Sequence, residues 1–148
     1  MPNKVLLDEF DGTPAQITFH HTDFVPTAAN DLRHASAVDV DVQLNLISLA
    51  NAAARQSTKF DFGAIRADRY AIRCAVELAA TPVAGEYIDF YLAPSQHATA
   101  GTGNPGSASG ADAAYTGYSS NLAASLRHLY HIGRAIVTAQ ATATVQVI

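Results

Sequence analysis

Regular alternation of side-chain type over residues 68–79 restricts most sharply what this chain can fold into. Every second residue there is large and apolar, in the order Tyr70, Ile72, Cys74, Val76 and Leu78. Because successive side chains of a β-strand point to opposite faces, this spacing predicts a strand with one buried face. Residues 86–93 are rich in aromatic and β-branched side chains and predict a second strand. The turn-forming residues 81–85 between them indicate a hairpin.

Further β-forming runs occur on both sides of this pair, at residues 4–10, 16–20, 38–44, 58–62, 129–139 and 141–148. The first two flank an Asp11-Gly12 turn and the last two adjoin each other, so each of these couples predicts a hairpin. A chain of 148 residues is the size of one domain with one hydrophobic core. We therefore predict a single all-β domain over residues 1–148, with antiparallel sheets arranged as a β-sandwich or jelly roll.

Two segments carry helical signals. Residues 119–128 predict one short amphipathic helix, with Ser119 or Ser120 as the N-cap. Its leucines recur at helical spacing on one face: Leu122, Leu126 and Leu129. Residues 44–56 fit either a helix or a continuing strand, and their leucine and alanine content favours the helix.

Residues 94–118 are dominated by Ala, Gly, Ser and Thr. Such side chains have little apolar surface to bury, so we expect a long surface loop that does not order itself. Loops of this length in compact domains are usually functional or disordered. Tyr115 and Tyr118, near its end, are candidate anchors to a partner subunit.

Composition narrows the classes of partner. The formal net charge of −4 and a sequence pI near 5.8 give no basic patch for a phosphate backbone, so we expect no nucleic-acid binding. No run of about 18 apolar residues occurs, so we expect no membrane-spanning helix. Cys74 is the single cysteine and lies within an apolar alternation, which favours a buried core thiol over a reactive one.

Motifs that could bind a nucleotide or a metal are incomplete. Residues 101–106 spell GxGxxG, but Pro105 and the Ser/Gly residues after it oppose the helix that a dinucleotide site requires. Two groups of residues offer metal ligands without completing a set, namely His20, His21 and Asp23, and His128 with His131. Asp39 and Asp41 share a predicted strand face but lack the glycine and glutamate of a calcium loop. We expect no metal and no cofactor.

Signals for catalysis are equally weak. The chain has no GxSxG elbow, and its lone cysteine lies in mid-strand with no paired histidine in view. Glu77 and Asp89 lie on strands predicted to be adjacent and could pair for glycoside hydrolysis, although outward-facing carboxylates on strands are common. We therefore name no catalytic residue and predict a structural or binding protein rather than an enzyme.

Charge is distributed unevenly along the chain. The positive residues of the middle segment are Arg55, Lys59, Arg66, Arg69 and Arg73, and negative residues gather near the N-terminus. This asymmetry suits contact between subunits, and a solvated surface explains it equally well. The candidate partner contacts are Tyr115, Tyr118, Arg55, Arg66 and Arg69.

Three stretches resemble small virion proteins of tailed bacteriophages, encoded among head and tail structural genes. They read AAARQS at residues 52–57, AATPVAG at residues 79–85 and DAAYTGYSSNL at residues 112–122. The resemblance covers roughly the last two thirds of the chain. It implies a β-sandwich or jelly-roll protein attached in many copies to the outer capsid, as a decoration or cement protein.

What this resemblance implies about partners follows from that role. The expected partners are the major capsid protein and further copies of this chain, with the protein made in the host cytoplasm and located on the virion. Many weak, symmetry-matched contacts would then stabilise the head by avidity. The alternative is a tail or tail-fibre component that binds host-surface carbohydrate through its tyrosines, although the absence of tryptophan weakens it. A third reading, a virion-borne glycan hydrolase, would need paired carboxylates in one cleft.

Overall fold

The structure, a computed structural model, describes residues 16–20, 39–44, 46, 49–61, 75–78, 81–141 and 144–147. The regular elements among these residues are mostly strands, with few helices. The strands are β1 (Gln16–His20), β2 (Asp39–Gln43), β3 (Arg55–Gln56), β4 (Ala75–Leu78), β5 (Tyr87–Leu92), β6 (Ala113–Ala114), β7 (Tyr130–Ile136) and β8 (Thr144–Val147). The helices are two 3-10 turns, η2 (Pro105–Ser107) and η3 (Tyr118–Ser120), and the α-helix α1 (Leu122–Leu126).

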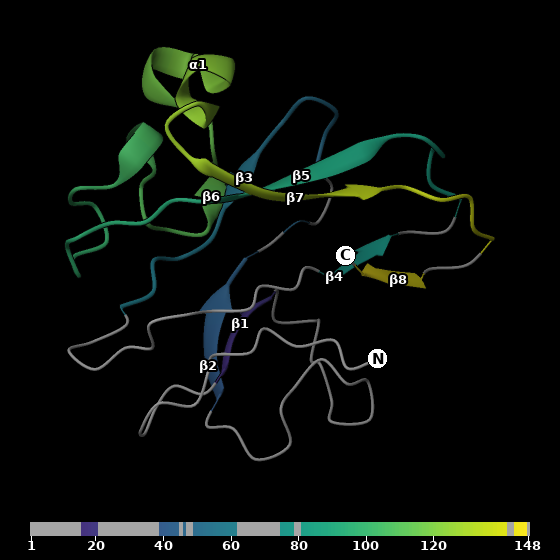
Figure 1. Cartoon of the computed structure of the whole chain (residues 1–148), viewed down its shortest axis with the longest axis horizontal. Coiled ribbons are helices and arrows are strands. Elements are labelled where there is room, and N and C mark those ends of the chain that lie inside the picture. The colour runs from purple at the N-terminus through teal and green to yellow at the C-terminus, as the bar shows by residue number, and fades with distance from the viewer. Residues whose placement is uncertain are drawn as a thin grey trace.

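The described strands form four two-stranded pairs (Figure 1). Three pairs are antiparallel, β3–β6, β4–β8 and β5–β7, whereas β1 and β2 run parallel. The prediction of antiparallel sheets is therefore wrong for the first pair. A parallel pair needs a crossover of a dozen or more residues, and the chain between His20 and Asp39 has that length. Residues 4–10, predicted to pair with β1, lie outside the described residues.

Both hairpins predicted in the C-terminal half are wrong. β4 pairs with β8 and β5 pairs with β7, so no strand of these pairs is bonded to its neighbour in sequence. The registers of the two pairs differ by one residue, as shown by Leu78 opposite Thr144 and Tyr87 opposite Ile136. The register shift between Phe90 and Tyr91 reverses this offset, so Leu92 opposite Tyr130 is again in step with the β4–β8 pair. Together they form one long, interrupted antiparallel ribbon.

The stretch expected to be a hairpin turn instead continues along this ribbon. Thr81 N donates to Gln140 O at 3.1 Å, and Gly85 N donates to Val137 O at 2.9 Å. Thr81 and Gly85 both have positive φ, 51° and 89°, so the backbone kinks at both residues. Gly85 adopts this angle without steric cost, whereas the β-branched Thr81 is strained by it, so the segment is an irregular part of the ribbon.

The buried side chains of the described residues come from several elements: Val76, Tyr115, Ser125, Ala135 and Val137. Ala135 lies between Arg134 and Ile136, which are both exposed. Because side chains alternate along a strand, β7 buries one face and leaves the other open to solvent. Val76 of β4 is 6% exposed, which confirms at this position the buried face predicted from the alternation.

The predicted helix near residue 120 is present and short. Its cap is Asn121 rather than Ser119 or Ser120, because the Asn121 side chain accepts a hydrogen bond from Ala124 N at 3.1 Å. Ser119 and Ser120 instead have positive φ and belong to η3. The leucines of the predicted apolar face are all half-buried, as expected: Leu122, Leu126 and Leu129.

The helix favoured for residues 44–56 is wrong for the part that is described. Turns occur there instead, with Leu49 N donating to Leu46 O and Ala53 N to Ala50 O, and β3 follows. The strand expected at residues 58–62 is also absent from its described residues, 58–61. Its role as a pairing segment is taken by β3, which lies just before it and pairs with β6.

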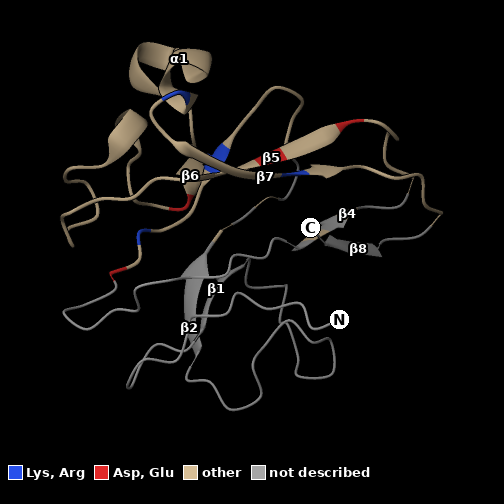
Figure 2. Cartoon of the chain, viewed as in Figure 1, with Lys and Arg blue, Asp and Glu red and all other residues tan. Residues whose placement is uncertain are grey.

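Residues 94–118 are ordered by contacts within the chain, contrary to the sequence prediction. The stretch contains η2 and β6, and it leads into η3. Gln56 Oε1 accepts a hydrogen bond from Ser109 N at 2.7 Å, beside the β3–β6 pair. Polar contacts to residues 54–59 thus replace the apolar burial that the composition lacks. Acidic and basic residues are interspersed over the described part, with no block of one sign (Figure 2).

Candidate functional site

The solvent-facing side of β5 and β7 carries a row of aromatic and charged side chains. Opposite residues in an antiparallel pair share a face, and three such couples occur here: Tyr87 with Ile136, Asp89 with Arg134, and Tyr91 with His131. We call these six residues the β5–β7 face. It is the strongest candidate functional surface among the described residues.

Side-chain contacts connect this face from end to end. The Arg134 guanidinium lies over the Tyr87 ring, 3.7 Å from its centroid, and binds Asp89. His131 contacts Asp89 on its other side, and its ring meets Tyr91 edge to face, with centroids 5.2 Å apart. Contacts of these kinds hold rings and charges in fixed positions.

A β-bulge brings His131 onto this face. The register shifts between Phe90 and Tyr91, so that Tyr91 lies opposite His131 and Ile132 is the extra residue. In an unbroken register His131 would be opposite Leu92, and its side chain would point to the other side of the ribbon. The bulge therefore makes the contact between His131 and Asp89 possible.

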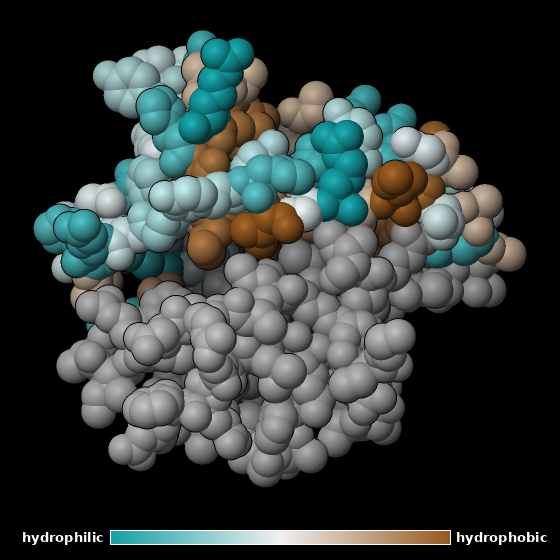
Figure 3. Space-filling model, in the orientation of Figure 1, coloured by the Kyte–Doolittle hydropathy of each residue, from teal (hydrophilic) through white to brown (hydrophobic). Residues whose placement is uncertain are grey.

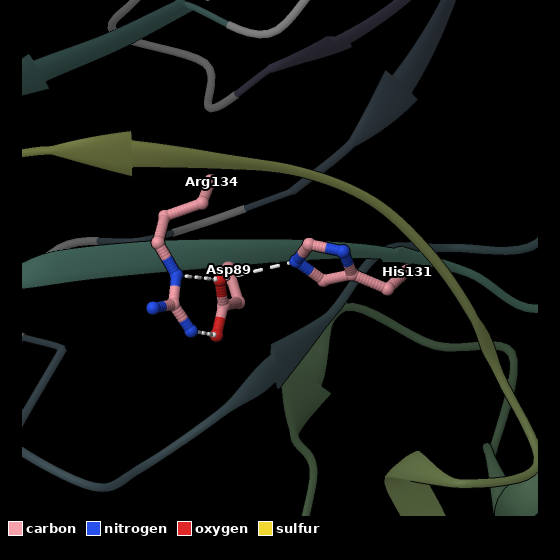
Figure 4. Close-up of polar contacts among 3 residues, drawn as sticks. All are labelled: Asp89, His131 and Arg134. Atoms are coloured by element: carbon pink, nitrogen blue, oxygen red, sulfur yellow. Dashed lines mark hydrogen bonds and ion pairs between the residues drawn. The ribbon is translucent and has the colours of Figure 1, made fainter.

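Asp89 is the electrostatic centre of the face (Figure 4). Arg134 Nε and Nη2 donate to its two carboxylate oxygens at 2.6 and 2.7 Å, and His131 Nε2 lies 3.1 Å from Oδ1. The hydrogen bond from Arg134 is the largest effect that lowers the pKa of Asp89 below its ordinary value. The same bond raises the pKa of Arg134. Asp89 is thus a neutralised anion at neutral pH and is a poor general acid.

Apolar side chains accompany these charges. Tyr87 is 55% exposed and Ile136 is 62% exposed, and Tyr130, at the other end of β7, is 66% exposed. In Figure 3 the hydrophobic residues of the described part are interspersed with hydrophilic ones and do not form one continuous patch. Exposed aromatic and apolar side chains beside charges that are already paired are a composition that suits contact with another protein.

The residues predicted as partner contacts differ in their exposure, and two of them lie outside the described residues. Tyr115 is only 6% exposed, and its hydroxyl donates to Gly106 O, so this tyrosine packs within the chain. The Tyr115 ring is thus part of the packing of residues 94–118. Tyr118 is 72% exposed in η3 and stays a candidate. Arg55 is partly buried in an ion pair with Asp112 at 2.9 Å, which gives it a role in holding the loop. Arg66 and Arg69 lie outside the described residues.

Within its described part, the structure does not bring together the residues of the nucleotide, glycosidase and metal motifs considered in the sequence. Residues 101–106 lead into the short 3-10 turn η2, and the backbone after it is extended. The helix that a dinucleotide site requires is therefore missing at this position, as the presence of Pro105 predicts. Glu77 and Asp89 are not on adjacent strands, because β4 and β5 do not pair, so that prediction is wrong. His128 follows α1, whereas His131 lies in β7 with Asp89. Cys74, His21 and Asp23 lie outside the described residues.

Sequence reasoning missed the grouping of Asp89, His131 and Arg134. The signal was present as alternation, since Tyr87, Asp89 and Tyr91 occupy one side of their strand. This signal points to a site only when β5 is known to pair with β7. In the part of the chain that the structure describes, no group of three or more His, Cys, Asp or Glu residues could hold a metal ion. Nor does any described helix have the length and hydrophobicity to cross a membrane.

Comparison with protein-family models, with curated proteins and with solved structures finds no match to this chain.

Proposed function

We propose that this chain is a structural protein of a phage virion, a capsid decoration or cement protein that binds subunits of the major capsid protein and stabilises the head. The β5–β7 face is the observation that carries this proposal. It offers exposed apolar side chains for contact, such as those of Tyr87 and Ile136, on a rigid two-stranded ribbon. The sequence motifs that resemble small virion proteins add independent support.

The charges of the β5–β7 face favour burial against another protein. Burying an unpaired charge is costly, whereas Asp89 already accepts two hydrogen bonds from Arg134. A partner can therefore cover this face without supplying a countercharge. Contact of this type is weak for one copy, and repetition over a symmetric lattice multiplies it.

A jelly-roll or sandwich fold is part of the same proposal. Such folds are built from long antiparallel ribbons that curl so that one face is buried. The hydrogen bonds between residues 81–86 and residues 137–140, which connect the β4–β8 and β5–β7 pairs, support this arrangement, as does the burial of Ala135 beside the exposed Arg134.

Cryo-electron microscopy of virions from the phage that encodes this chain tests the proposal directly. We expect density for this chain at regular positions on the capsid lattice, with the β5–β7 face against a capsid subunit. Density confined to the tail, or its absence from the virion, would overturn the cement function.

A capsid co-sedimentation assay tests the surface itself. Replacing Ile136 with Asp places a charge in the proposed contact and is expected to reduce co-sedimentation at least about tenfold, since an unpaired charge would be buried. The matched control is Val83→Ser, because Val83 is another exposed apolar residue but lies outside the face. Equal binding by both variants would show that the contact lies elsewhere on the chain.

The second candidate is a tail component that binds host-surface carbohydrate. The specific observation in its favour is the exposure of three tyrosine rings, those of Tyr87, Tyr118 and Tyr130, since sugars stack on exposed aromatic rings. Glycan-array binding that is lost in Tyr87→Ala, together with density on the tail, would establish this function in place of the first.

A further inference from the structure

The ammonium group of Lys59 lies among four oxygen atoms of residues 95–104. Its Nζ atom is 2.9 Å from Ser95 Oγ, 3.1 Å from Thr99 O, 2.9 Å from Thr102 O and 2.7 Å from Asn104 Oδ1. We call these four atoms the oxygen cage. They come from one short stretch of chain that bends around a single point, which is how protein loops surround a bound cation.

The atoms of the cage are themselves held in place. Asn104 presents its oxygen to Lys59 while its Nδ2 donates to Ala100 O and to Ala108 O. Ser95 Oγ also accepts a hydrogen bond from His97 N at 3.2 Å. A built site of this kind differs from a surface lysine that happens to meet a carbonyl, because its ligands have second partners that fix their direction.

The chemistry of the cage selects the cation. All four ligands are neutral oxygens, and sites for Ca²⁺ normally include carboxylates at about 2.3–2.6 Å. The observed distances are those of N–H···O hydrogen bonds, typically about 2.7–3.2 Å. A lysine ammonium has three N–H donors for these four acceptors, whereas a free ammonium ion has four. The cage therefore suits a monovalent cation of ammonium type.

We propose that the oxygen cage is a binding site for a monovalent, ammonium-type cation, and that the chain fills it with its own Lys59 side chain. The side chain acts as a tethered ion that orders residues 95–104 and leaves the loop independent of dissolved metal. This role goes beyond the proposed capsid function, since it concerns a site away from the β5–β7 face and holds whatever the partner is.

Emptying the cage tests the proposal. In Lys59→Ala, the truncated side chain leaves room for an ion, and we expect faster amide hydrogen exchange in residues 95–104. Ammonium chloride should slow that exchange again, whereas choline chloride at the same concentration should not, because choline has no N–H donor and is too large. Calcium chloride is expected to be less effective than ammonium. Lys59→Met is the matched control, because its side chain fills the space without charge and should not respond to ammonium.

Two results would overturn the proposal. One is unchanged hydrogen exchange in residues 95–104 of Lys59→Ala, which would show that the lysine does not order the loop. The other is an equal response of the Lys59→Ala and Lys59→Met variants to ammonium, which would show a general salt effect instead of a site.

A measurement on the unaltered chain does not depend on the variants folding. The sequence contains two lysines, Lys4 and Lys59, so amine labelling followed by peptide mass spectrometry reports on each separately. An ammonium held by four oxygens must leave the cage before it can react. We expect Lys59 to be labelled at least about tenfold more slowly in the native protein than in urea, where the cage is lost. Equal rates for Lys59 in the two conditions would overturn the proposal.

Discussion

Arg134 holds both carboxylate oxygens of Asp89 from the directly opposite position of the neighbouring strand, with Nε to Oδ1 at 2.6 Å and Nη2 to Oδ2 at 2.7 Å. The pair joins β5 to β7 through side chains as well as through the backbone. It also fixes the Arg134 guanidinium over the Tyr87 ring. A cross-strand ion pair of this kind contributes to the choice of register, because a slip by one residue would separate the two charges.

Removing the charge of Asp89 tests this link through its pH dependence. The folded-state pKa of Asp89 is lowered from its ordinary value of 3.8, chiefly by the hydrogen bond from Arg134. The stabilisation is therefore fully present above that ordinary value and is lost as the pH falls through the lowered folded-state pKa. We expect Asp89→Asn to lower the unfolding temperature by about 1–3 °C at pH 7, a small effect because the pair is exposed.

Thermal unfolding of both proteins between pH 7 and pH 2 provides the measurement. The difference between wild type and Asp89→Asn should be constant from pH 7 to pH 5 and should shrink in more acidic solution. A difference that stays the same at pH 2 would contradict an ionic origin.

Tyr115 is expected to be essential for the order of residues 94–118, whereas Tyr118 is not. Tyr115 is buried and its hydroxyl donates to Gly106 O, while Tyr118 is exposed. Tyr115→Ala should cost about 3–5 kcal/mol, as for other large buried side chains, and Tyr118→Ala should change stability by less than about 0.5 kcal/mol. Denaturant unfolding measures both values. Similar losses from the two substitutions would contradict the different environments of the two rings.

Alkaline pH should also destabilise the protein through Tyr115. Burial is the main effect that raises the pKa of this phenol above its ordinary value of 10.0. Its contribution is therefore fully present below pH 10 and is lost as the pH rises through the raised folded-state pKa. Unfolding curves between pH 8 and pH 12 should show a steeper loss for the wild type than for Tyr115→Phe, which has no phenol to ionise at this position. Parallel curves would place the alkaline transition on other groups.

Two glycines of the loop should differ sharply in their tolerance of alanine. Gly110 has φ +74°, and a Cβ atom there would lie 2.3 Å from the Ala100 carbonyl oxygen. The backbone strain alone costs about 1–3 kcal/mol, and the clash adds to it. A Cβ atom on Gly101 would meet nothing within 4 Å, so Gly101→Ala should be within about 0.5 kcal/mol of wild type. Chemical denaturation distinguishes them, and equal stabilities would show that the loop can rearrange.

Cysteine pairs test the strand pairing that sequence reasoning missed. Tyr87 and Ile136 are opposite in the register, so the double cysteine variant should form a disulfide under mild oxidation, in a background where Cys74 is serine. The matched control joins positions 87 and 130, which are several residues apart along the ribbon and too far for a disulfide. Mass spectrometry of the oxidised proteins reads the result. Cross-linking of the control alone would rule out the β5–β7 pairing.

Local patterns in the sequence determined the types of several elements. Alternation predicted the strand at β4, aromatic and β-branched content predicted the strand at β5, and leucine spacing predicted a short helix within residues 119–128. These inferences succeed because the period of a strand or helix is a property of the backbone itself, so a few consecutive residues reveal it. The helix cap was missed by one or two positions, since Ser119, Ser120 and Asn121 can all act as caps and the backbone angles chose among them.

The tertiary structure alone decided which strands meet. A turn signal at residues 81–85 is compatible with a hairpin and with a kinked ribbon, and only the hydrogen bonds to distant residues such as Gln140 separate the two. The same distant pairing brought Arg134 and His131 to Asp89. Lys59 likewise binds Ser95 and Asn104, which lie far from it along the chain. Contacts between residues far apart in sequence have no local period, so the sequence of a single chain does not display them.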